Sequence, residues 1–202
     1  MDELVLRGMA KWPNVPSVFG WLSLDRRGDW LVRGERIAHP AVTAYIGRNY
    51  ERDNEGRWFF QNGPQRVFVA LEYTPFVYRI VSADSAPLAL ECHTGRPVAA
   101  VRAGRLDHGV TLLLQTEHGI GLVHDRDLCR LFPHLIDANG GPLSDSVLAE
   151  IFDRLQQQRP APLWLKFHDS HVRIEAILSA AVPGRFGFVA RPVQPAGQEA
   201  CC

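Results

Sequence analysis

The sequence predicts an α+β protein built from two similar halves. Short apolar runs with strand-like alternation recur along the chain, turn residues separate them, and few segments have helical spacing. An order of strand, glycine turn, strand and short helix also occurs twice, beginning near residues 22 and 113. The chain has 202 residues, 46% of them apolar, so it is long and apolar enough to bury a core in each half.

The first half is expected to span residues 1–85. Its elements are predicted from apolar spacing and from the turn residues between apolar runs. In order they are a helix over 2–11, strands over 19–24 and 30–32, a helix beginning at Pro40, and strands over 58–60, 66–72 and 76–81. Proline suits the first position of a helix, and Asn62-Gly63 is a strong hairpin signal between the strands that follow.

The second half is expected to span residues 86–194. Its predicted elements are strands over 97–101, 110–114 and 120–123, helices over 125–135 and 145–157, and strands over 163–167, 172–178 and 186–193. Ser144 precedes the clearest helix as a capping residue. Residues 83–87 are small, polar and ended by proline, so they are the predicted boundary between the halves, and residues 195–202 are a predicted flexible tail.

The internal repeat is predicted from element order. Residues 22–32 align with residues 113–123 as a strand, a turn centred on Gly28 or Gly119, and a return strand. Few residues are identical, so a coincidence of two strand–helix–strand units is the alternative to duplication. The shared order favours duplication.

The charge balance disfavours two classes of partner. Lys and Arg number 22, and Asp and Glu also number 22, so no net field attracts nucleic acid or an anionic membrane surface. The longest apolar runs have the length of strands and fall far short of a membrane-spanning helix. Because Asp2 and Glu3 stand where a secretory signal has basic residues, we expect a cytoplasmic location.

No cofactor is predicted. The chain lacks the glycine-rich phosphate-binding motifs and the Gly-x-Ser-x-Gly nucleophile elbow. Its cysteines contain no Cys-x-x-Cys and are expected to be reduced thiols: Cys92, Cys129, Cys201 and Cys202. A metal or redox role for the terminal pair is the minor alternative to an exposed pair without function.

Parts of the first half resemble an uncharacterised family of proteobacterial proteins of unknown function. The matching stretches are Lys-Trp-Pro-Asn-Val-Pro (11–16), Gly-Trp-Leu (20–22), Trp-Phe-Phe-Gln-Asn-Gly-Pro-Gln-Arg-Val (58–67) and Leu-Glu-Tyr-Thr-Pro-Phe (71–76). More loosely, residues 28–76 resemble a second uncharacterised bacterial family with two repeated strand-wrapped-helix motifs, for which signalling has been suggested. The resemblance implies two halves, each an antiparallel sheet curled round a helix, and a ligand-sensing role. It supplies no catalytic residue.

A polar turn between two apolar strands is the candidate ligand-binding site. Amide and guanidinium groups suit recognition of anionic or amide-bearing ligands. The candidate residues are Gln61, Asn62, Gln65, Arg66, Glu72 and Arg79. The alternative is a solvated hairpin with cross-strand ion pairs.

Histidines are the candidate metal ligands. His168 and His171 flank Asp169 and Ser170, and on a tight turn their imidazoles would converge on a divalent ion. In an extended strand, positions three apart point to opposite faces, so a polar hairpin loop is the alternative. A second arrangement would use His118, His124 and Asp125 around the second glycine turn, with His134 on the following helix, and would need a further partner that the sequence does not identify.

Aromatic residues are concentrated in the first half, and most of them are expected to form its core. A sheet wrapped on one short helix cannot hide all of them, so we expect a leftover apolar patch as a dimer contact or as the wall of a small-molecule cleft. The residues are Trp12, Trp21, Trp30, Trp58, Phe59, Phe60, Tyr73, Phe76 and Tyr78.

Together these patterns favour a non-enzymatic ligand-binding or signalling module. It would hold a small molecule or a protein partner at the cleft between its halves or at the polar turn. The first alternative is a metal-dependent enzyme that uses the clustered histidines, and the second is a homodimer without a ligand. Neither nucleic acid nor membrane is an expected partner.

Overall fold

The structure, a computed structural model, describes residues 1–12, 15–82 and 87–195. Its contacts divide the chain into two units, each described by itself. The first contains Met1–Pro75, His93–Gly95 and the described residues from Gly187 on, and the second contains Phe76–Cys92 and Arg96–Phe186. Most of the predicted boundary (83–87) and of the predicted tail (195–202) lies outside the described residues. Every helix in the described part is too short or too polar to cross a bilayer.

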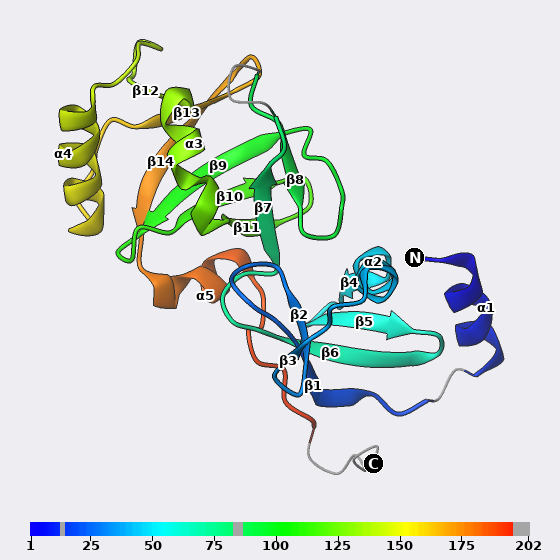
Figure 1. Ribbon diagram of the computed structural model, residues 1–202. Helices are drawn as coiled ribbons and strands as arrows, with labels where there is room; N and C mark the ends of the chain where they lie inside the picture. The colour runs from blue at the N-terminus through cyan, green and yellow to red at the C-terminus, as the bar shows by residue number, and fades with distance from the viewer. Residues whose placement is uncertain (13–14, 83–86, 196–202) are drawn as a thin grey trace. The chain divides into compact units, whose positions relative to one another are not determined.

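The first unit is a six-stranded sheet with two helices (Figure 1). The strands are β1 (Val18–Leu24), β2 (Trp30–Val32), β3 (Glu35–Arg36), β4 (Tyr50–Arg52), β5 (Trp58–Asn62) and β6 (Gln65–Leu71), in the order β3-β2-β1-β6-β5-β4. The helices are α1 (Glu3–Lys11) and α2 (Pro40–Arg48). Proline begins α2, and the buried Asn49 ends it by donating from Nδ2 to the Tyr45 carbonyl at 3.0 Å.

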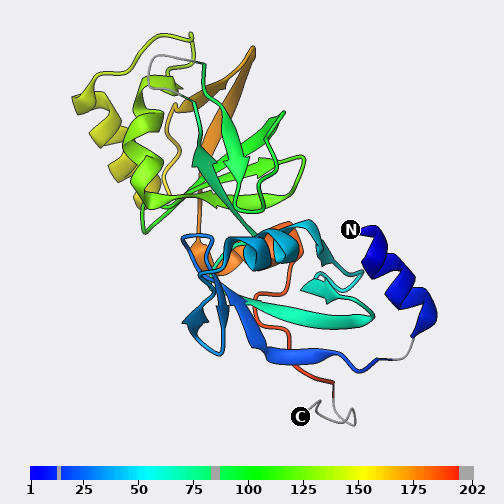
Figure 2. The same cartoon turned by 45° about the vertical axis from the view of Figure 1, so that its right-hand side comes forward.

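The second unit is an eight-stranded sheet covered by short helices (Figure 2). The strands are β7 (Phe76–Ile80), β8 (Leu90–Cys92), β9 (Val101–Asp107), β10 (Leu112–Thr116), β11 (Ile120–Val123), β12 (Leu135–Ile136), β13 (Trp164–Phe167) and β14 (Ser170–Ile177), in the order β12-β13-β14-β9-β10-β11-β7-β8. The α-helices are α3 (Leu128–Leu131), α4 (Asp145–Gln156) and α5 (Val182–Phe186), and the 3₁₀ turns are η1 (Asp125–Asp127), η2 (Phe132–His134) and η3 (Ser179–Ala181).

Both sheets contain the same six-strand arrangement, so the predicted fold class of two similar α+β halves is confirmed. The order β11-β10-β9-β14-β13-β12 repeats β3-β2-β1-β6-β5-β4, with a helix between the two three-strand groups in each case. In both, the first strand of the repeat pairs in parallel with the last, and β7 also pairs in parallel with β11. The sheets are therefore antiparallel except at these three pairings.

The strand order shifts the predicted alignment of the repeat by one strand. The sequence aligned β1 and β2 with β10 and β11, whereas by position in the sheet they correspond to β9 and β10. The reason is β9, of which only the first residue was predicted as strand. Arg102 and Arg105 interrupt its apolar pattern, and its buried and exposed residues alternate irregularly. Common ancestry of the two arrangements stays a prediction.

Two other predicted elements are wrong. The helix expected over 125–135 is broken into η1, α3 and η2, with Pro133 inside η2, where proline prevents a regular helix from continuing. The strand expected over 186–193 is absent from the described residues, which make only an isolated bridge between Arg57 and Val189 there. The hairpin β5–β6 and helix α4, which Ser144 caps through the Val147 amide, are confirmed.

Gly121 allows β7 and β11 to pack closely. A Cβ atom at this position would lie 2.5 Å from Tyr78 Cε2 and 2.8 Å from Phe76 Cβ. Gly121→Ala is expected to lower the free energy of unfolding by about 1–3 kcal/mol, because overpacking strains a core. Urea titration followed by far-UV circular dichroism measures this loss.

Gly184→Ala in α5 is the control, since no heavy atom outside the adjoining residues and the backbone of its own helix lies within 4 Å of the added methyl group. It should leave stability unchanged or raise it by up to about 1 kcal/mol. Equal effects of the two substitutions would contradict the close packing at Gly121.

Candidate functional site

A pocket with a volume of about 320 Å³ lies between α2 and one face of the six-stranded sheet. We call it the α2 pocket. It is lined by Trp21, Leu22, Val32, Ile37, Val42, Tyr45, Ile46, Phe60, Asn62 and Val67. Its volume lies near the lower end of the range of roughly 300–1,000 Å³ for small-molecule sites. The lining is mostly apolar, as it is in such sites.

Strand register brings these side chains together. Phe60 pairs with Val67 across β5 and β6, and Leu22 pairs with Val32 across β1 and β2. Because side chains alternate along a strand, Asn62 lies on the same face as Phe60. Further along this face, a cluster of Trp30, Tyr50 and Trp58 is buried.

The rim of the α2 pocket exposes large apolar side chains. Trp21 is 39% exposed, Val32 40% and Val42 43%. The other aromatic residues that were expected in the core are buried, apart from Trp12. Trp21 therefore supplies part of the exposed apolar surface that the sequence predicted, and it does so in the wall of this pocket.

Two polar groups in the pocket wall are available to a ligand. The Tyr45 hydroxyl and the Asn62 carboxamide make no hydrogen bond to any residue that the structure describes. The Tyr45 ring is fixed by an edge-on contact with Phe60, with 5.3 Å between ring centroids. An apolar cavity with a few oriented polar groups is the usual form of a small-molecule site.

Of the predicted ligand-binding residues, only Asn62 lines the α2 pocket. Gln61 is 1% exposed and points its Nε2 at the Gly63 carbonyl, 2.9 Å away. Gln65 Nε2 donates to the Pro16 carbonyl at 3.2 Å. These two amides stabilise the chain around the β5–β6 turn.

The charged members of the predicted set have separate partners in the structure. Arg66 is the second residue of β6 and Glu72 follows its last residue, so they are separated by about 20 Å of extended chain. The Arg66 guanidinium lies 4.7 Å from the centre of the Phe59 ring, and Glu72 Oε2 accepts from the Arg26 amide at 3.1 Å. Arg79 belongs to the second unit and pairs with Asp127.

The predicted metal ligands lie on an exposed hairpin. His168 and Asp169 form the turn between β13 and β14, and His171 pairs with Lys166 across the strands. The His168 ring stacks on Phe167 at 4.2 Å. Within residues 1–12, 15–82 and 87–195, no group of three or more His, Cys, Asp or Glu side chains is arranged to hold a metal ion. This geometry matches the alternative, a polar hairpin loop.

The two histidines of the second predicted arrangement, His118 and His124, have local partners. His118 Nε2 lies 2.8 Å from the Pro97 carbonyl. His124 Nδ1 accepts from the Arg126 amide at 3.1 Å. Burial, and after it the charge of Arg79, lowers the pKa of His124, so its ring is neutral at pH 7.

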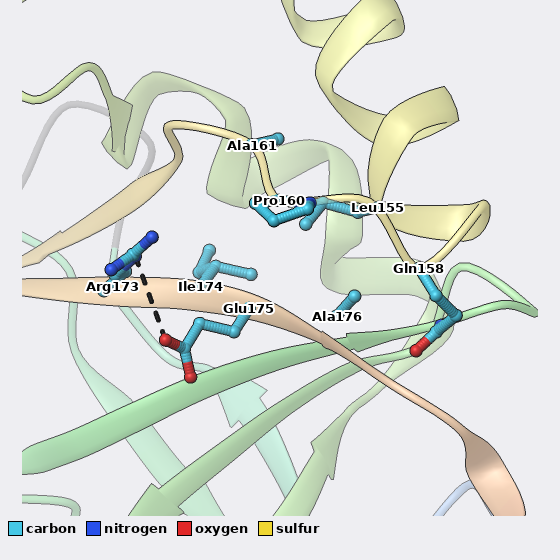
Figure 3. A pocket seen from close by; sticks show the side chains of 8 residues that line it. All are labelled: Leu155, Gln158, Pro160, Ala161, Arg173, Ile174, Glu175 and Ala176. Carbon is cyan, nitrogen blue, oxygen red and sulfur yellow. Dashed lines mark ion pairs between the residues drawn. The ribbon is translucent and has the colours of Figure 1, made fainter.

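A second pocket, of about 250 Å³, lies in the second unit between the end of α4 and β14 (Figure 3). Its polar side chains already bind one another or the backbone. Glu175 lies 3.1 Å from Arg105 and 3.9 Å from Arg173, and Gln158 Nε2 donates to the Ile177 carbonyl at 3.2 Å. A third cavity, of about 140 Å³, has only apolar residues around it and is smaller than typical ligand sites. The α2 pocket is therefore the best candidate.

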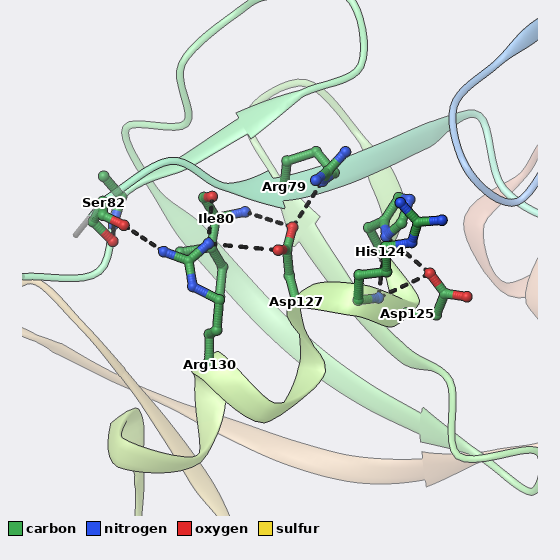
Figure 4. Close-up of polar contacts among 9 residues, drawn as sticks. Arg79, Ile80, Ser82, His124, Asp125, Asp127 and Arg130 are labelled. Atoms are coloured by element: carbon green, nitrogen blue, oxygen red, sulfur yellow. Dashed lines mark hydrogen bonds and ion pairs between the residues drawn. The ribbon is translucent and has the colours of Figure 1, made fainter. Parts of the chain in front are cut away.

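A buried carboxylate, Asp127, joins η1 to the end of β7 and was not predicted from the sequence (Figure 4). It is 4% exposed and accepts from Arg79 Nε at 2.8 Å and from the Ile80 amide at 3.1 Å. Arg130 donates to the carbonyls of Ile80 and Ser82. No motif marks this cluster, because its residues are about 48 positions apart in the chain. We assign it a structural role.

Asp127 is expected to be ionised in the folded protein. Burial by itself raises the pKa of Asp127, but the hydrogen bonds from Arg79 and the Ile80 amide outweigh burial and hold that pKa below its usual value.

Comparisons with known proteins support the fold. The sequence profile of the family described as "Protein of unknown function (DUF2946)" matches residues 1–193. A crystal structure of a DUF1285 family protein from Silicibacter pomeroyi DSS-3 is similar with a TM-score of 0.53 and 15% identity, over 81% of this chain and 85% of that chain. At this identity the likeness extends to the fold alone.

A second DUF1285 family protein, from Shewanella baltica OS155, has a TM-score of 0.40 and 17% identity, over 54% of this chain and 87% of that chain. None of the curated proteins matches the sequence. The expected resemblance to an uncharacterised family is thus confirmed, whereas the short motifs and the proteobacterial origin stay predictions.

Removing the Asp127 carboxylate should lower the stability of the fold, and the loss should depend on pH. Asp127→Asn is expected to lower the free energy of unfolding at pH 7 by about 1.5–3 kcal/mol, because hydrogen bonds to a charged group are lost. Since the folded state lowers the pKa of Asp127, its contribution is complete above the unfolded pKa of about 3.9 and is lost as the pH falls through the folded pKa. Urea titrations at pH 7 and pH 3 measure the difference.

Asp153→Asn, at an exposed carboxylate on α4, is the matched control and should change stability little at either pH. A difference between the wild type and Asp127→Asn that does not shrink at pH 3 would contradict the assigned role of the carboxylate.

Proposed function

The chain belongs to the DUF2946 family of proteins of unknown function, and we propose that its first unit is a binding module that holds a small, mostly apolar ligand in the α2 pocket. The main support for the proposal is that the pocket has exposed apolar walls together with two polar groups, on Tyr45 and Asn62, that lack a hydrogen-bond partner in the described part of the chain. Exposed apolar surface in a concave site costs free energy unless something covers it. A ligand of matching size would cover it.

The pocket wall favours binding over catalysis. Apart from Tyr45 and Asn62, its lining residues carry hydrocarbon or indole side chains. General acid–base or nucleophilic chemistry uses histidine, carboxylate, thiol, lysine or tyrosine groups, and of these the described pocket wall holds Tyr45 alone, with no second group beside it to activate it. The proposed role is therefore recognition of a compact molecule, as a carrier or as the sensing part of a signalling protein.

Narrowing the pocket should weaken binding. Val42→Phe adds a ring to the exposed rim and is expected to lower the affinity for the fluorescent probe 1-anilinonaphthalene-8-sulfonate about tenfold, which corresponds to about 1.4 kcal/mol. The measurement is a fluorescence titration, with near-UV circular dichroism to show that the variant keeps its tertiary packing.

Val147→Phe is the matched control, because Val147 is a helical valine with 42% exposure that lines none of the three pockets. Its titration should match that of the wild type. Unchanged affinity in Val42→Phe, or an equal loss in both variants, would count against the α2 pocket as the binding site.

A further inference from the structure

A cation lies beside the rim of the α2 pocket. The guanidinium carbon of Arg33 is 3.8 Å from the centre of the Trp21 ring, and Trp21 lines the pocket. The backbone amide of Arg33 donates to the Trp21 carbonyl at 2.8 Å. The contact with the ring face and the backbone bond hold the positive charge next to the apolar wall.

The backbone around Arg33 is unusual for arginine. Val32 pairs with Glu35, so Arg33 and Gly34 form a two-residue hairpin loop, with φ values of 51° and 86°. Turns with positive φ at both positions favour Asn, Asp or Gly at the first. Strained residues of this kind occur often at functional sites. The choice of arginine here therefore indicates a use for its side chain.

Arg33 has no carboxylate partner in the described part of the chain, in contrast to three other arginines of the same unit. Arg36 pairs with Asp29 at 2.9 Å, Arg48 with Asp2 at 3.2 Å, and Arg57 with Asp53 at 2.7 Å. The guanidinium of Arg33 is thus able to form charge-assisted hydrogen bonds to a bound anion.

We propose that the ligand of the α2 pocket is an amphipathic monocarboxylate, whose compact apolar body lies in the pocket and whose carboxylate binds Arg33. This inference rests on the proposed function. Charge complementarity selects an acid over its neutral analogue, and the limited volume selects a short chain or a single ring system. The Tyr45 hydroxyl and the Asn62 carboxamide would recognise any further polar group on the ligand.

Isothermal titration calorimetry with octanoate and octanamide tests the proposal, since the two probes share a chain and differ in charge. The wild type should bind octanoate about three- to tenfold more tightly, and the preference should shrink as salt rises. Arg33→Gln should remove the preference while the affinity for octanamide stays the same. Arg33→Gly suits the positive φ of the turn and should behave like Arg33→Gln. It replaces Arg33→Gln in the experiment if that variant folds poorly.

Arg66→Gln is the matched control, because Arg66 also stacks on an aromatic ring of this sheet, at 4.7 Å, but that ring, Phe59, does not line the pocket as Trp21 does. It should keep the preference for octanoate. Equal binding of both probes by the wild type, or a preference that survives the loss of Arg33, would overturn the carboxylate proposal and leave the pocket intact. If neither probe binds the wild type, the proposed function itself fails.

Discussion

The nine-residue helix α2 has to cover one face of a sheet whose central strands, β1 and β6, have seven residues each. The helix extends about 14 Å, whereas each strand extends about 23 Å. The buried aromatic cluster of Trp30, Tyr50 and Trp58 fills part of this face. The remaining apolar surface, near Trp21 and Val32, is left partly exposed and forms the α2 pocket. The core and the candidate site follow from the same mismatch in length.

In the second unit, more than one helix covers the corresponding face of the sheet. Its sheet repeats the arrangement of the first, but α3 and the twelve-residue α4 cover it together. The apolar cavity beneath them is only about 140 Å³. Hydrogen bonds and ion pairs of Asp127 and Arg130 join η1 and α3 to β7. The same topology therefore leaves a mostly apolar pocket of about 320 Å³ beside α2 in the first unit, whereas the two pockets of the second unit are smaller, at about 250 and 140 Å³.

Features that depend on local sequence were predictable, and features that depend on register were not. Asn62-Gly63 indicated the β5–β6 hairpin, and Ser144 indicated the start of α4. β9 was missed except for its first residue, because its arginines hide the strand pattern. For the site, the excess of aromatic residues predicted an uncovered apolar patch. Only the pairing of the strands and the turn at Arg33 determine that Trp21 forms that patch with a cation beside it.

We infer that the proposed binding site arises because α2 is shorter than the sheet it covers. This inference is tested by an NMR titration of the full chain with octanoate, observing indole N–H and methyl groups. We expect the signals of Trp21, Ile46 and Val67 to shift together and to saturate, while those of Ile151 and Val172 in the second unit stay unchanged. Shifts confined to the second unit, or scattered without saturation over both units, would contradict the account.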